Sequence, residues 1–146
     1  MSKIVIINGP NLNLVGVREP EIYGTQTFDD YIEELQSKFP DQEIEYFQSN
    51  HEGALIDKMQ EVGFDAKGII LNAAGYSHTS IALGDTIKAI TSPVVEVHIS
   101  NIYEREEFRH HSYVTEPSVA HFIGHGLKGY EMAVDFIISH YKLSER

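Results

Sequence analysis

The chain has 146 residues, 42% of them hydrophobic and 23% charged, which is enough to bury the core of one domain spanning residues 1–146. Its formal net charge of −11 disfavours binding to nucleic acid or to an anionic membrane, because phosphate contacts need clustered Lys and Arg, and no apolar run approaches the ~20 residues of a membrane span. The lack of cysteine excludes disulfides and thiolate catalysis and fits a reducing compartment, so we expect a soluble, cytoplasmic protein.

The first half of the chain alternates strand and helix patterns. Lys3 to Ile7 is a β-branched apolar run, typical of a strand covered on both faces of a parallel sheet. A long loop rich in Gly, Pro and Asn follows from Asn8 to Gly24, and loops of this length are usually functional. Residues 27–40 predict a helix that Thr27 caps and Pro40 ends. A second strand is predicted over residues 43–48, and a second helix reaches Gly63.

The second half repeats the alternation. Residues 68–71 predict a third strand, and the next helix is expected to run roughly from Thr79 to Ile90. A fourth strand is predicted over residues 94–98 and a fifth over residues 119–123. A closing helix follows, with an apolar face that extends from Leu127 to Tyr141.

Five strands that alternate with helices predict an α/β fold, here a flavodoxin-like three-layer sandwich with a five-stranded parallel sheet in the order 2-1-3-4-5. In such sheets ligands bind beyond the carboxyl ends of the strands, near the point where the strand order reverses. We therefore expect the segments after strands one, three and four to meet around a ligand. These segments are rich in Asn, His, Glu and Arg.

Arginine is concentrated in two of the predicted loops. The chain has four arginines, of which Arg18 lies in the loop after strand one, while Arg105 and Arg109 lie in the segment after strand four. A guanidinium group is permanently charged and its planar donors suit carboxylates, so this placement favours an anionic small molecule as ligand. The alternative is a solvated loop in which these arginines pair only with neighbouring glutamates.

The fourth predicted strand carries two ionisable side chains, Glu96 and His98. They share one face of the strand because side chains alternate with a period of two. A carboxylate that orients a histidine is an arrangement used for proton transfer. The alternative is a buried histidine whose hydrogen bonds are simply satisfied.

Five ordered motifs, spread over essentially the whole chain, resemble those of the type II 3-dehydroquinate dehydratases. They are Asn-Gly-Pro-Asn-Leu-Asn at 8–13, Arg-Glu-Pro-Glu-Ile-Tyr-Gly at 18–24, Leu-Asn-Ala-Ala-Gly-Tyr-Ser-His-Thr-Ser at 71–80, Glu-Val-His-Ile-Ser-Asn at 96–101 and Arg-Glu-Glu-Phe-Arg-His-His-Ser at 105–112.

The resemblance implies a flavodoxin-like fold and reversible dehydration of 3-dehydroquinate to 3-dehydroshikimate through an enolate. It implies no metal or organic cofactor, and trimers that assemble into a homododecamer. The expected context is the shikimate pathway and aromatic amino acid biosynthesis, while quinate catabolism by the same reaction stays an alternative.

For catalysis, the resemblance assigns Tyr23 as the base that removes a proton from the carbon next to the ketone. Holding this phenol ionised near neutrality requires lowering its pKa by roughly 3 units, or about 4 kcal/mol, for which Arg18 and Arg105 are the available cations. His98 is implied as the acid that protonates the departing hydroxyl, with Glu96 polarising its imidazole. The amide of Asn11 is implied to stabilise the enolate oxygen.

The resemblance also implies a set of substrate-binding residues with polar groups that match a hydroxylated ring acid. Arg109 and His78 are expected to donate hydrogen bonds, and Asp85 to accept one across a subunit contact. The whole set is Asn72, His78, Asp85, Ile99, Ser100 and Arg109.

Three other functions are compatible with parts of the pattern. A flavodoxin-like protein can bind FMN or phosphate, although the loop after the first strand has Pro10 and several Asn where a phosphate cradle has Gly, Ser or Thr. A metal hydrolase would draw its ligands from His110, His111, His121 and His125. A phosphate-eliminating lyase would use similar Arg and His loops.

Overall fold

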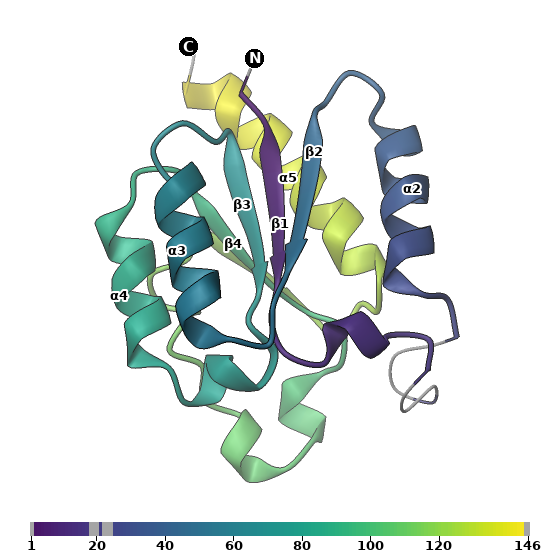
Figure 1. Cartoon of the computed structure of the whole chain (residues 1–146), viewed down its shortest axis with the longest axis vertical. Coiled ribbons are helices and arrows are strands. Elements are labelled where there is room, and N and C mark those ends of the chain that lie inside the picture. Colours follow the sequence, from purple (N-terminus) through teal and green to yellow (C-terminus); the bar gives the residue numbers. More distant parts are fainter. Residues whose placement is uncertain (1, 18–20, 22–24, 145–146) are drawn as a thin grey trace.

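The computed structural model describes residues 2–17, 21 and 25–144 of the chain (Figure 1). Within these residues five strands form one parallel sheet in the order β2-β1-β3-β4-β5, as predicted. The strands are β1 (Ile4–Asn8), β2 (Ile44–Gln48), β3 (Gly68–Asn72), β4 (Val94–His98) and β5 (Ala120–Ile123).

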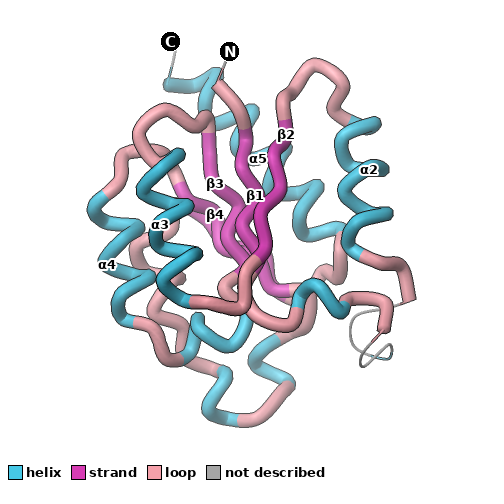
Figure 2. The backbone as a smooth tube through the Cα atoms, viewed as in Figure 1, coloured by secondary structure: helices cyan, strands magenta, loops and turns pink. Residues whose placement is uncertain are grey.

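Two pairs of helices cover the two faces of the sheet, which gives the predicted three layers (Figures 1 and 2). Helices α2 (Phe28–Lys38) and α5 (Lys128–Ser144) enclose one apolar cluster against the sheet. Helices α3 (Glu52–Val62) and α4 (Ile81–Ala89) enclose a second cluster on the opposite face. None of the helices described is long and apolar enough to cross a membrane.

The apolar run of β1 serves both clusters. Ile4 and Ile6 pack toward α2 and α5, while Val5 and Ile7 pack toward α3 and α4, and all four side chains are fully buried. Successive side chains of a strand point to opposite faces, so a strand covered on both sides has to be apolar at every position.

Side-chain caps determine where two of the helices begin. The Thr27 hydroxyl accepts a hydrogen bond from the Asp30 N–H (3.2 Å), so α2 begins where it was predicted. Helix α4 begins later than expected, because the short 3-10 helix η2 (Ala74–His78) precedes it. Ser80 then caps α4 by accepting from the Leu83 N–H (3.0 Å).

A close contact between the segments after β1 and β3 brings the predicted site together. The Gly9 N–H donates to the Asn72 carbonyl (2.7 Å). A Cβ on Gly9 would lie 2.6 Å from the Ala73 carbonyl oxygen, so a larger residue would push the two segments apart. The segments that follow β1 and β3 can therefore lie this close together because residue 9 is a glycine.

Candidate active site

A cavity of ≈ 140 Å³ lies beyond the carboxyl ends of the central strands. Pro10, Leu12 and Ile102 contribute to its apolar wall. Ten of the residues predicted for the site are described by the structure, and eight of them line the cavity, namely Asn11, Asn72, His78, His98, Ile99, Ser100, Arg105 and Arg109. The segments after β1, β3 and β4 thus meet as the strand order predicts.

Asn11 reaches the cavity from a left-handed backbone conformation (φ 71°), which asparagine adopts more readily than most residues. Its N–H donates to the Asn50 side-chain oxygen (3.0 Å). The Gln48 amide donates to the Gly9 carbonyl (3.1 Å), which ties the same turn to the end of β2. Gln48, at the end of β2, and Asn50, just after it, therefore hold the turn that contains Asn11.

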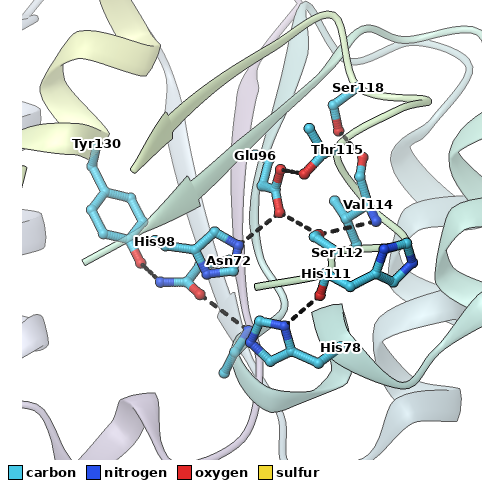
Figure 3. A network of polar contacts seen from close by, with 11 residues as sticks. Asn72, His78, Glu96, His98, His111, Ser112, Val114, Thr115, Ser118 and Tyr130 are labelled. Carbon is cyan, nitrogen blue, oxygen red and sulfur yellow. Dashed lines mark hydrogen bonds and ion pairs between the residues drawn. The ribbon is translucent and has the colours of Figure 1, made fainter. Parts of the chain in front are cut away.

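Asn72 belongs to a buried chain of hydrogen bonds (Figure 3). Its Nδ2 donates to the Tyr130 hydroxyl (2.9 Å), and its Oδ1 accepts from the Ala74 N–H (3.1 Å). The Tyr130 hydroxyl donates onward to Asn8 Oδ1 (2.8 Å). Burial raises the pKa of Tyr130, so its hydroxyl keeps the proton that it donates. Tyr130 lies on the closing helix, whose apolar face was predicted from Leu127 to Tyr141, but this hydroxyl contact was not predicted.

Glu96 and His98 form a hydrogen-bonded pair at the end of β4. His98 Nε2 lies 2.7 Å from Glu96 Oε2, and both side chains are buried. His98 lines the cavity, whereas Glu96 lies behind it and is fully enclosed. Because Nε2 donates to the carboxylate, Nδ1 is the nitrogen of this ring that remains for exchange with a ligand.

Two hydroxyl groups complete the surroundings of Glu96 (Figure 3). Ser112 Oγ donates to Oε2 (2.6 Å), and Thr115 Oγ1 donates to Oε1. Burial alone would raise the pKa of Glu96, but the hydrogen bonds from His98, Ser112 and Thr115 outweigh it and hold this pKa below its usual value. The carboxylate is therefore ionised at neutral pH. Neither hydroxyl was singled out in the sequence, although a buried glutamate requires such donors.

His78 offers the cavity a hydrogen-bond acceptor, where a donor was expected. Its Nδ1 lies 2.7 Å from the His111 carbonyl oxygen, and because a carbonyl can only accept, Nδ1 carries the proton. Burial, and the nearby His98 and Arg109, lower the pKa of His78, so its ring is neutral at pH 7. The remaining nitrogen, Nε2, is then an acceptor, whereas His78 was expected to donate.

Arg105 and Arg109 lie in a compact segment built from two short 3-10 helices, η3 (Ile102–Glu104) and η4 (Glu107–Arg109). Arg109 Nε donates to the Glu106 carboxylate, so the pairing within the segment that was considered as the alternative is partly present. Both arginines nevertheless line the cavity, and no carboxylate does so among the described residues. The site is locally positive in a chain of net charge −11 and suits an anion.

Among the described residues that were predicted for the site, Glu96 and Asp85 do not line the cavity. Glu96 supports His98 from behind, as described above. Asp85 lines a separate hollow on α4 with Lys88 and Tyr113. Arg18 and Tyr23 lie outside the described residues. In the described part of the chain, no three His, Asp or Glu side chains are grouped as metal ligands, and this includes the four histidines considered for a hydrolase.

Comparison with known proteins matches the chain to one family. The profile of the family described as Dehydroquinase class II matches residues 2–138. A 3-dehydroquinate dehydratase of Exiguobacterium is 48% identical and one of Actinobacillus pleuropneumoniae 45%; the alignments cover 96% and 95% of this chain and 97% and 92% of the relatives. A protein of Verticillium alfalfae named catabolic 3-dehydroquinase is 42% identical, over 99% of this chain and 98% of the relative.

A solved structure agrees with the same family. The type II dehydroquinase of Butyrivibrio crossotus superposes with a TM-score of 0.90 at 44% identity, covering 93% of this chain and 97% of the other. The similarity therefore extends over nearly the full length of both chains.

Proposed function

The chain belongs to the class II dehydroquinase family and catalyses the dehydration of 3-dehydroquinate, and we propose that it does so in the cavity beyond β1, β3 and β4. The observation that carries this assignment is the grouping of Arg105 and Arg109 with His98, whose ring is backed by a buried carboxylate. Such a site offers cations for the substrate carboxylate and a proton donor for the departing hydroxyl.

Tyr23 is the base in this proposal, and it takes the proton from the carbon next to the ketone. Arg18 and Arg105 stabilise its phenolate, because a positive charge favours the anionic form of a nearby group. The support for Tyr23 and Arg18 is the motif at 18–24. No lysine lines the cavity among the described residues, which favours direct proton abstraction to an enolate over a Schiff base.

Asn11 stabilises the enolate oxygen by donating from its amide, directly or through water. Loss of the hydroxyl then needs one proton, which His98 supplies from Nδ1 so that water departs. The ionised Glu96 stabilises the positive charge on the imidazole before this transfer and orients the ring. The proton balance closes when the base passes its proton to solvent and His98 regains one.

The substrate is held by Asn72, Ile99, Ser100 and Arg109, which line the cavity, and by the acceptor nitrogen of His78. Arg109 and Ser100 with the Ile99 amide offer donors, and His78 accepts from a ring hydroxyl. Donors and an acceptor fixed around one ring discriminate strongly against analogues that lack a hydroxyl.

Asp85 acts from a neighbouring subunit in a homododecamer built from trimers. What supports this is its place in a separate hollow on α4, flanked by the exposed apolar side chains Ile81 and Tyr113. Contiguous exposed apolar groups often mark a contact between subunits. Light scattering tests the assembly, since a trimer and a dodecamer differ fourfold in mass.

We place the enzyme in the cytoplasm and in aromatic amino acid biosynthesis. The lack of cysteine fits a reducing compartment. Most of the named relatives above are called simply 3-dehydroquinate dehydratase, although one is called catabolic. Rescue of an aromatic auxotroph that lacks its own dehydratase supports this assignment, whereas rescue confined to growth on quinate contradicts it.

The activity is tested directly with purified protein and 3-dehydroquinate. Dehydration conjugates a carbon–carbon double bond with the ketone, so the product absorbs in the ultraviolet. A steady rise in absorbance that scales with enzyme concentration is expected. A flat trace with folded protein contradicts the function.

A further inference from the structure

Glu96 connects the acid of the site to the segment that follows the arginines. It leaves β4 with a fully buried side chain, and its carboxylate accepts from three donors (Figure 3). His98 and Ser112 donate to Oε2, and Thr115 donates to Oε1. Ser112 and Thr115 come 16 and 19 positions later in the chain, just beyond the segment that carries Arg105 and Arg109.

This arrangement leaves the carboxylate little freedom to turn or to take up a proton. Each oxygen already faces a donor, and hydrogen bonds to the charged form favour that form. The other ionisable groups facing it are few among the described residues: His98 beside it, His78 across the His98 ring, and His121 opposite it in the β4–β5 register. Glu96 therefore offers a steady negative charge and a fixed acceptor to the imidazole.

We propose that Ser112 and Thr115 are positioning residues, which act through Glu96 to keep the Nε2 proton of His98 directed at the carboxylate and to orient the ring so that Nδ1, protonated in the imidazolium, faces the departing hydroxyl. In this arrangement the two hydroxyls fix the carboxylate, and the carboxylate fixes Nε2–H. This role depends on His98 acting as the acid in the proposed function. Neither hydroxyl touches the cavity, so neither is a catalytic residue.

Backbone contacts hold the 112–118 segment independently of the two hydroxyls. Tyr113 N–H donates to the Ser77 carbonyl (2.8 Å), and Val114 is fully buried in the cluster under α3 and α4. A Cβ on Gly84 would lie 2.7 Å from the Tyr113 carbonyl oxygen, so the glycine lets this segment lie against α4. Removing one hydroxyl should leave the segment in place.

The chain supplies a matched control in the same segment. Ser118 Oγ donates to the Val114 carbonyl (2.7 Å), whereas the hydrogen bonds to Glu96 in the described structure come from His98, Ser112 and Thr115 (Figure 3). Ser112 Oγ also accepts from the Val114 N–H (3.2 Å), so Ser112→Ala loses one local bond besides the one to Glu96. Thr115→Val removes only a hydroxyl at nearly constant shape, and Thr115→Ser keeps it.

Steady-state kinetics of these variants test the role. Ser112→Ala and Thr115→Val should lower kcat by about ten- to hundredfold, the kinetic equivalent of one hydrogen bond to a charged group, with KM changed by less than about threefold. Thr115→Ser and Ser118→Ala should stay close to the parent enzyme. Unchanged kcat in both hydroxyl-deleted variants overturns the proposal, and so does an equal loss in Ser118→Ala.

A substrate-free measurement separates this proposal from the proposed function. In protein carrying ¹⁵N-labelled histidine, held at a pH at which imidazole is neutral, the ring shifts of His98 should report a proton on Nε2, the form left once Nδ1 has given up its proton, in the parent and in Ser118→Ala. Ser112→Ala and Thr115→Val should move these shifts toward a mixture of tautomers. Identical His98 shifts in all variants overturn the positioning role, even if the parent enzyme dehydrates 3-dehydroquinate. Altered shifts in a protein without that activity would contradict only the proposed function.

Discussion

At the scale of the residue, the hydrogen-bond partner of each histidine in the site determines which of its ring nitrogens carries a proton. Glu96 receives three donors and faces His98, while the His111 carbonyl receives the Nδ1 proton of His78. The two imidazole rings are nearly parallel, with centroids 6.1 Å apart, yet they offer different chemistry. In the proposed mechanism the His98 ring gives up a proton, whereas the His78 ring accepts a hydrogen bond.

Tyr23→Phe removes one ionisable oxygen and should lower kcat by several orders of magnitude while the fold and ligand binding persist. Product absorbance measures turnover, and calorimetric titration of a substrate analogue measures ligand binding. Tyr103→Phe is the control, because Tyr103 is an exposed tyrosine in the arginine segment and does not line the cavity. Turnover near that of the parent in Tyr23→Phe would exclude this residue as the base.

The depressed pKa of His78 predicts a pH-dependent stability. Its folded-state pKa lies below the ordinary value of 6.5, so between these two pKa values the unfolded chain binds more protons than the folded one. The stabilisation is complete above pH 6.5 and is lost as the pH falls toward the folded-state pKa. Urea unfolding should therefore show a steeper loss of stability from pH 7 to pH 5 in the parent than in His78→Gln.

His111→Gln is the control for this comparison. It removes an imidazole next to the same contact but keeps the backbone carbonyl that accepts from His78. We expect its pH dependence to follow the parent. Equal slopes in the parent and in His78→Gln would show that His78 titrates alike in the folded and unfolded chains.

At the scale of the element, the site depends on helix α5 although no residue of this helix lines the cavity within the described chain. The Tyr130 hydroxyl bridges Asn8 at the end of β1 and Asn72 at the end of β3. Its ring packs against Phe28 of α2, with centroids 4.9 Å apart. One tyrosine thus links both helices of this layer to the two central strands.

Tyr130→Phe leaves the Asn8 and Asn72 amides each without one partner in a buried place. We expect a loss of about 1–3 kcal/mol in the free energy of unfolding and a severalfold rise in KM, because Asn72 loses the contact that orients it. Chemical denaturation and steady-state kinetics measure the two effects. Tyr31→Phe, which removes a hydroxyl from the same aromatic cluster with no bond to either asparagine, should leave KM unchanged. Equal KM values in both variants would contradict the orienting role.

At the scale of the whole molecule, the negative net charge and the local positive site have to coexist. Four lysines pair with carboxylates away from the cavity: Lys3 and Lys58 with Glu45, Lys38 with Glu131 and Lys88 with Glu116. Among the described residues, Arg105 and Arg109 are the Arg or Lys side chains that line the cavity. At ordinary salt the electrostatic potential of the acidic residues is screened over about 10 Å. The arginines therefore dominate the potential that a ligand meets at contact distance.

Asp85→Ala tests whether the active unit is larger than one chain. Asp85 lines a different hollow from the substrate cavity, so within one subunit its removal should not affect KM. If Asp85 reaches a neighbouring subunit, KM should rise about tenfold and the assembly should loosen, as measured by light scattering. Asp57→Ala, at an exposed aspartate of α3, is the control. A variant with unchanged KM and unchanged mass would contradict the role across subunits.

The strand order and the layers followed from the sequence because each depends on local pattern. Continuous apolar strands, amphipathic helices and short connections leave few ways to arrange five βα units. The same rule placed the three polar segments at one edge of the sheet, so eight of the ten described residues that were predicted for the site line one cavity. The beginning of α4 was less predictable, since both Thr79 and Ser80 can cap a helix and only the preceding 3-10 turn decides between them.

What the tertiary structure alone decided is the partner of each polar group. Glu96 and His98 could be paired from strand periodicity, but their further partners Ser112 and Thr115 lie beyond a separate loop segment. Tyr130 and Asn8 are 122 positions apart, and nothing in either local pattern indicates their bond. The acceptor role of His78 depends on a backbone carbonyl 33 positions away. Periodicity determines which face a side chain occupies, whereas donor and acceptor roles depend on contacts that exist only once the whole chain has packed.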